Sequence, residues 1–227
     1  MSDDVMPAGR RNLRTDNLLQ ESPEEIEYEL RSAEGAIWTG GRLLIGIGVF
    51  VFASLAFAYF YLKSVNSDQL WRPGGVTAPI GAGTAIFIVA VGSAALNAFG
   101  IFRLRRGMSV DWEVSGWTSV LGGLTAVGLQ IWQLTNLHFF PGSSGYASCF
   151  VAWAVLNVSL LLCGCYWLET LLARSLRLRR AIAKDGGPAR STQPVARLFR
   201  ASLEGCAYFW GFIALISLIF WVLFYVI

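Results

Sequence analysis

The few ionisable side chains that fall in or beside apolar stretches limit the chemistry open to this chain. Glu169 and Glu204 are the only acids expected there. A carboxylate is costly in hydrocarbon, so it usually faces protein, water or an opposite charge. Glu204 follows Arg200 by four residues, a spacing that places both on one helix face, and Glu169 lies close to Arg174. We expect ion pairs near the membrane surface, with a buried contact to another helix or subunit, or proton transfer, as the alternatives.

Metal ligands are scarce, and motifs of known catalytic sites are absent from the sequence. His138 is the single histidine, whereas haem and copper centres need several imidazole ligands. No Cys-x-x-Cys pair is present, and cysteine within an apolar run usually acts as a small buried hydrophobe. The cysteines are Cys149, Cys163, Cys165 and Cys206. No phosphate-binding loop, Gly-x-Ser-x-Gly or His-Glu-x-x-His motif occurs. The sequence therefore predicts no metal site and no catalytic site in this chain.

The elements that carry these residues are apolar enough to enter a membrane. Of the 227 residues, 55% are hydrophobic and 15% are charged, with a mean hydropathy of +0.52. A membrane-spanning helix needs about 20 mainly apolar residues, and a backbone in lipid must satisfy its hydrogen bonds internally. Five stretches meet this length: 43–62, 78–102, 116–137, 146–172 and 203–227. The fold class predicted is an all-α bundle of five transmembrane helices, residues 38–227.

The polar segment before this bundle, residues 1–37, is expected in the cytoplasm. The first 22 residues lack apolar periodicity, which predicts disorder. Ser22, Pro23, Glu24 and Glu25 are typical of a helix start, because serine caps and glutamates complement the helix dipole. We expect a short acidic helix over 23–34 at the membrane surface. A flexible turn is expected at 185–188.

The distribution of lysine and arginine among the connections predicts the orientation. Positive loops stay in the cytoplasm. The first connection holds Lys63 and Arg72, and the third, 138–145, holds neither lysine nor arginine. The second and fourth hold Arg103, Arg105, Arg106, Arg174, Arg177, Arg179, Arg180, Lys184, Arg190, Arg197 and Arg200. We therefore expect a cytoplasmic N-terminus and an external C-terminus.

Two further groups of polar residues have expected contacts. Amide side chains within the spans can form hydrogen bonds between helices, and these are Gln130, Gln133, Asn97 and Asn157. The arginines after the fourth span can hold the headgroups of anionic lipids, and these are Arg174, Arg177, Arg179 and Arg180.

Several short strings, in order, resemble one family of membrane proteins. The first span ends in Ala58-Tyr59-Phe60-Tyr61-Leu62-Lys63, and the third contains Gly128-Leu129-Gln130. Glu204 precedes an aromatic cluster at 208–212, and the chain finishes on aromatic residues at 220–225. These strings resemble the five-helix form of cytochrome c oxidase subunit III. Polar positions of that family are replaced here by Gly48, Gln133, Ala154, Asn157, Gly211 and Ala214.

The resemblance implies a non-catalytic accessory subunit of a respiratory haem-copper oxidase in the bacterial inner membrane. It implies that haem and copper reside in a catalytic partner subunit, with other oxidase subunits and phospholipids as further partners and no nucleic acid. A homologue associated with nitric oxide reductase is the close alternative. A small transporter is the runner-up, although midplane charges and internal repeats are not visible. An intramembrane enzyme would need a nucleophile–base pair, and none is evident.

The orientation predicts where reporter domains fused to the chain will lie. A reporter placed after Lys184 should be cytoplasmic, because the surrounding connection is rich in arginine. A reporter placed after Ile227 should be external. Paired alkaline phosphatase and green fluorescent protein fusions measure both positions, and a cytoplasmic signal after Ile227 would contradict five crossings.

Overall fold

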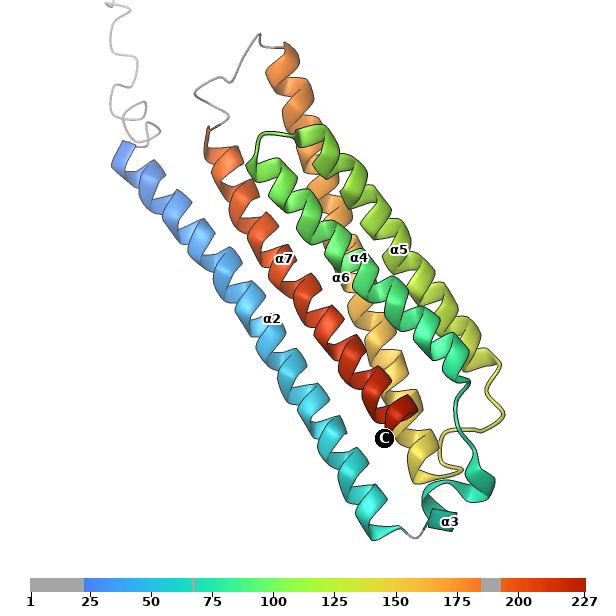
Figure 1. Ribbon diagram of the computed structural model, residues 1–227. Helices are drawn as coiled ribbons and strands as arrows, with labels where there is room; N and C mark the ends of the chain where they lie inside the picture. Colours follow the sequence, from blue (N-terminus) through green and yellow to red (C-terminus); the bar gives the residue numbers. More distant parts are fainter. Residues whose placement is uncertain (1–22, 67, 185–192) are drawn as a thin grey trace, which may run out of the picture.

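Five long helices make up the architecture, and they lie alongside one another in alternating directions (Figure 1). The computed structural model describes residues 23–66, 68–184 and 193–227, and this part of the chain contains no strand. The long helices are α2 (Pro23–Val65), α4 (Ile80–Arg105), α5 (Ser109–Thr135), α6 (Gly145–Lys184) and α7 (Gln193–Trp221). Shorter pieces are α3 (Asp68–Trp71), a 3₁₀ turn (Pro73–Gly75) and a final π turn (Val222–Val226).

Four of these helices are long and apolar enough to cross a membrane, by length and composition. The candidate spans within the described residues are Glu24–Val65, Ile80–Arg105, Gly145–Arg180 and Ala196–Val226. The chain is therefore a helical, multi-pass membrane protein. Helix α5 has 27 residues but lies outside this set, because glycine, serine, threonine and glutamine interrupt its apolar residues. The third of the five expected crossings stays a prediction.

Helix α2 differs from the expected arrangement of a surface helix followed by a separate span. It is helical from Pro23, where the described residues begin, but the predicted end near Glu34 is wrong, since one helix of 43 residues continues to Val65. No proline interrupts residues 24–65, and apolar residues follow Glu34 closely, so nothing terminates the helix there. The expected disorder of 1–22 and the turn at 185–188 lie outside the described residues.

The turns between helices define two ends of the bundle. Helices α4 and α5 form a tight hairpin through Gly107, whose φ of +85° suits glycine. This turn lies at the same end as the start of α7 and the far end of α6 (Figure 1). We call it the charged end, because Arg103, Arg105, Arg179, Arg197 and Arg200 gather there. Helix α3 and the finish of α7 mark the opposite end, here called the aromatic end.

The α4–α5 hairpin packs closely because small residues face one another. The hydroxyl of Ser119 donates to the carbonyl of Ser93 at 2.7 Å, and Ser93 Oγ donates back to the carbonyl of Ser119. A Cβ on Gly122 would lie 3.2 Å from that of Ser93. Small residues let helix backbones approach, which supports association in lipid, where the hydrophobic force between helices is weak.

Tyrosines hold the final π turn at the aromatic end. The last carbonyls of a helix have no partner within it. The hydroxyl of Tyr59 on α2 donates to the carbonyl of Leu223 at 2.7 Å, and Tyr146 on α6 donates to that of Phe224 at 3.2 Å. Both tyrosines are buried. Their rings lie at the edge of a packed aromatic interior that includes Trp71, Phe150, Trp153, Phe220 and Phe224.

The closest approach at this end joins Gly83 of α4 to the Tyr225 ring, and it predicts a cost for any side chain there. A Cβ on Gly83 would overlap Tyr225, whose hydroxyl is fixed by Gln133. Gly83→Ala should lower the free energy of unfolding by about 1–3 kcal/mol, because the added methyl overpacks the contact. Gly81→Ala is the matched control, since no atom lies within 4 Å of its Cβ position. Denaturant titration in mixed micelles, followed by circular dichroism, measures both, and equal effects would contradict the packing.

Candidate functional site at the charged end

A cavity of about 620 Å³ lies at the charged end, between α4, α5, α6 and α7. Arginines from three helices reach it: Arg105 from α4, Arg179 from α6 and Arg200 from α7. Its walls are largely apolar. The lining residues are Leu104, Arg105, Ser109, Glu113, Ser175, Leu178, Arg179, Ala196, Phe199, Arg200, Leu203 and Glu204. We call it the arginine cavity.

The most enclosed charge in the arginine cavity is Glu113 on α5. Its carboxylate accepts a bond from Arg179 Nη1 at 2.8 Å, and the Ser175 hydroxyl lies 3.5 Å from it. The side chain of Glu113 is 11% exposed, whereas that of Arg179 is 54% exposed. A carboxylate shielded from water needs a compensating charge. Arg179 therefore ties α6 to α5 where α5 begins.

Glu204 also lines the cavity, but its partner differs from the expected one. Arg105 Nη2 of α4 lies 3.4 Å from Glu204 Oε1, with both side chains partly in water. Among the described residues, no carboxylate lies within 4.0 Å of Arg200, so the expected Arg200–Glu204 pair is wrong. A basic residue that precedes an acid by four residues is the weaker orientation on a helix, and α4 offers a cross-helix alternative.

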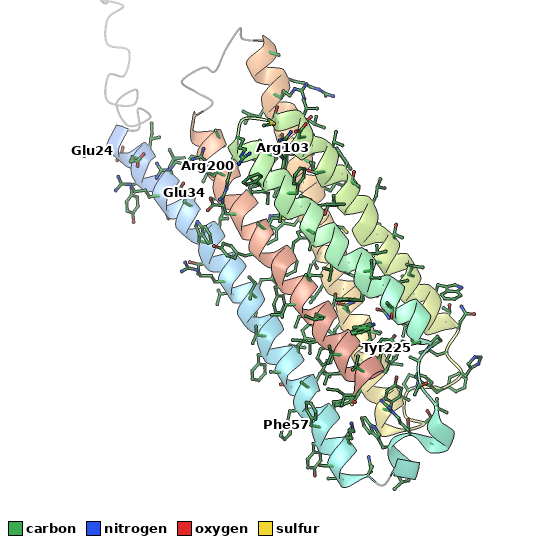
Figure 2. All side chains as sticks on the ribbon, in the orientation of Figure 1. Glu24, Glu34, Phe57, Arg103, Arg200 and Tyr225 are labelled. Carbon is green, nitrogen blue, oxygen red and sulfur yellow. The ribbon has the colours of Figure 1, made fainter. Side chains whose placement is uncertain are left out.

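A second cavity of about 460 Å³ adjoins the first, between α2 and α7. Arg200 and Glu204 line both cavities. Arg197 of α7 bonds to Glu27 at 3.0 Å and to Glu34 at 2.8 Å, both on α2. Arg200 and Glu34 lie at this end of the bundle, on α7 and α2 respectively (Figure 2). Arg197 thus connects the first turns of α2 to α7.

The other sequence-predicted residues of this end do not enter the arginine cavity. Glu169 is exposed on α6, and no ion pair joins it to Arg174 in the described part of the chain. Their separation of five residues places them on different sides of the helix. Arg174, Arg177 and Arg180 are exposed on α6 and line no cavity described here. Of the four arginines expected at lipid headgroups, Arg179 alone lines the arginine cavity.

The expected amide contacts are mostly at the aromatic end, and only some connect helices. Gln130 is buried, but its amide bonds to Gln133 at 3.0 Å within α5. Gln133 makes the interhelix contacts, to the Tyr225 hydroxyl at 2.7 Å and the Pro79 carbonyl at 3.4 Å. Ser217 of α7 reaches Asn157 of α6 at 3.3 Å.

Asn97 and His138 complete the set of expected polar and ligand positions. Asn97 is buried on α4, and its amide has no hydrogen-bond partner in the described part. His138 is exposed near the aromatic end, and the cysteines are all free. Within residues 23–66, 68–184 and 193–227, no three His, Cys, Asp or Glu side chains gather as candidate metal ligands.

Two acidic residues of the site were missed because the third helix begins earlier than predicted. The expected start at residue 116 left Asp111 and Glu113 in a loop, whereas α5 begins at Ser109. Asp111 pairs with Arg103 across the hairpin, and Glu113 pairs with Arg179. Their position in the first two turns of an apolar helix was the available signal, because acids favour the positive end of the helix dipole.

The difference in burial predicts different coupling energies for the two ion pairs of the cavity. Glu113 and Arg179 should couple by about 1–3 kcal/mol, since removing Arg179 leaves a shielded carboxylate unpaired. Glu204 and Arg105 should couple by about 0–1 kcal/mol, because both are partly in water. Double-mutant cycles with glutamine, read by reversible unfolding, measure each pair.

The Arg200→Gln and Glu204→Gln pair is the control for these cycles and should be additive. A coupling between Arg200 and Glu204 larger than that of Glu113 and Arg179 would contradict the contacts described.

Comparison with protein-family models and with curated proteins gives no match for this chain.

Proposed function

We propose that this chain is a non-catalytic accessory subunit of a membrane complex, similar to subunit III of a haem-copper oxidase, in a bacterial inner membrane. Its partner would be the catalytic subunit that carries haem and copper. Five helices would cross the bilayer, with the N-terminus cytoplasmic and the C-terminus external. Its work would be to stabilise the catalytic subunit and to bind lipid.

The observation that carries the proposal is the uncovered apolar surface of α2. Of the apolar 18-residue stretch in this helix, only 11% is buried inside the structure, whereas 50% is buried in the corresponding stretch of the last span, Ala196–Val226. Phe50, Phe57 and Phe60 are each more than half exposed, and Figure 2 shows Phe57 directed away from the bundle. An apolar face of this length needs lipid or another subunit beside it. The interior of the bundle is filled by aromatic side chains, and α2 presents an apolar face to its surroundings. This combination suits a structural role.

The position of Gly48 favours a role without proton transfer. The resemblance places an acid of the family at this point of the first span, and here the backbone of Gly48 lies against Phe212 of α7. A Cβ would come within 2.6 Å of the Phe212 ring. Helix packing thus takes the place of a polar side chain, and a glutamate would have to displace the Phe212 ring.

The placement of arginines supports the orientation proposed. The α4–α5 turn and the facing ends of α6 and α7 share the charged end, whereas Lys63 and Arg72 belong to the aromatic end. An excess of arginine marks the cytoplasmic side. Helix α5 pairs with α4 along its length, which suits a fifth crossing (Figure 1).

The lipid part of the proposal concerns the exposed side of α6 at the charged end. Arg174, Arg177 and Arg180 are exposed there, at the end that the orientation assigns to the cytoplasmic leaflet. Each such arginine near an anionic surface contributes about 1 kcal/mol to attraction. This side of α6 would therefore lie against anionic headgroups.

Purification of the tagged chain from its native membrane in a mild detergent tests the oxidase assignment. Haem should co-purify, seen as α and Soret bands in reduced-minus-oxidised spectra, because the catalytic partner remains bound. A tagged, unrelated polytopic protein from the same membrane is the control. Absence of haem from intact, folded chain would refute the proposal, and so would haem bound by the chain expressed alone.

A further inference from the structure

The arginine cavity has a net positive charge once its ion pairs are counted. Three arginines and two glutamates line it, which leaves one positive charge in excess (3 − 2 = 1). Arg179 is matched by Glu113 and Arg105 by Glu204. Arg200 is the guanidinium without a carboxylate within 4.0 Å in the described part of the chain. An anion that enters the cavity therefore meets an unmatched positive charge.

Three arginines from three helices line the cavity. An arginine side chain presents a planar fork of donors, which suits the oxygens of a phosphate group better than it suits a single neutral acceptor. Ser109 and Ser175 add hydroxyl groups to the same lining. A phosphate offers several acceptor oxygens, so it can bond to Arg200 while it also approaches Arg105 or Arg179.

The volume and the apolar walls of the cavity indicate the size and the polarity of a ligand that would fit it. About 620 Å³ is far more than a phosphate ion fills, and it lies within the range of pockets that hold organic molecules. Leu104, Leu178, Phe199 and Leu203 supply apolar walls. The ligand that fits both parts of the cavity has a phosphate group and an apolar portion.

We propose that the arginine cavity binds a phosphate ester with an apolar portion, held at its phosphate by Arg200. The ester could be presented by a phospholipid of the adjoining leaflet or by a soluble molecule, because both carry the same group. This inference extends the lipid contact of the proposed function, but it does not rest on the oxidase assignment. Arg200 is the principal contact, because it lines the cavity, whereas Arg174, Arg177 and Arg180 do not.

Calorimetric titration of the purified full chain in a non-ionic detergent tests the site with two probes. Dihexanoyl phosphatidylglycerol represents the lipid source, and glycerol phosphate represents the soluble source. At least one probe should bind saturably, and Arg200→Gln should weaken that binding about tenfold, the loss expected for a charge-assisted hydrogen bond. Arg106→Gln is the matched control, because Arg106 at the α4–α5 turn is exposed, as Arg200 is, but lines no cavity described here.

Two further variants keep the test decisive if Arg200→Gln disturbs folding. Arg200→Lys retains the charge and should retain binding within a few-fold. Leu178→Trp fills the cavity without changing its charge and should abolish binding.

Binding of phosphatidylglycerol alone assigns the lipid source, and binding of glycerol phosphate assigns a soluble one. Failure of both probes to saturate, or equal losses in Arg200→Gln and Arg106→Gln, would overturn the proposal. None of these readouts involves haem, so they are independent of the oxidase test.

Discussion

Hydrocarbon contains no water that could hydrogen-bond to a backbone amide or solvate a charged side chain. Polar groups of the bundle must therefore find partners within the protein, and the rest of the structure depends on this requirement. Every long element is a helix, because a helix satisfies its own amides and carbonyls. The exceptions lie at helix ends, where carbonyls lose their partners. Tyr59 and Tyr146 supply those partners at the final π turn. The same requirement explains why both tyrosines are buried under an aromatic cluster, since each is held by a specific acceptor and not by water.

Charged side chains also need partners where water is excluded, and most of them gather at one end of the bundle. Arginines and acids concentrate at the charged end, where ion pairs connect α5 to α6, α4 to α7 and α2 to α7. The coupling energies expected for these ion pairs differ, because Glu113 is more shielded from water than Glu204. The cavity among these pairs is lined by Arg200, which has no carboxylate within 4.0 Å in the described part of the chain.

Helix α2 relates the fold to the proposed role. It contacts α7 and α6 along one side, and the opposite side carries large apolar residues. Arg197 secures its first turns, while Phe52 packs on Trp153 deeper in the bundle. A helix attached along one side, with the other left apolar, presents a continuous surface to a neighbouring subunit or to lipid. The close contact of Gly48 with Phe212 adds to the packing of α2 on α7.

The sequence by itself determined the helical class, the four most apolar spans and the clustering of arginine, because these depend on local composition and on periodicity within one segment. It did not determine that α2 continues through Glu34, or that α5 begins early enough to include Glu113. It also assigned Glu204 to Arg200, whereas the structure pairs it with Arg105. Partners across helices depend on the rotation and axial register of two helices at once. The spacing of residues along one helix determines neither its rotation nor its register against another helix. Only the tertiary structure therefore decided which charges pair and which, like Arg200, line a cavity without a carboxylate partner.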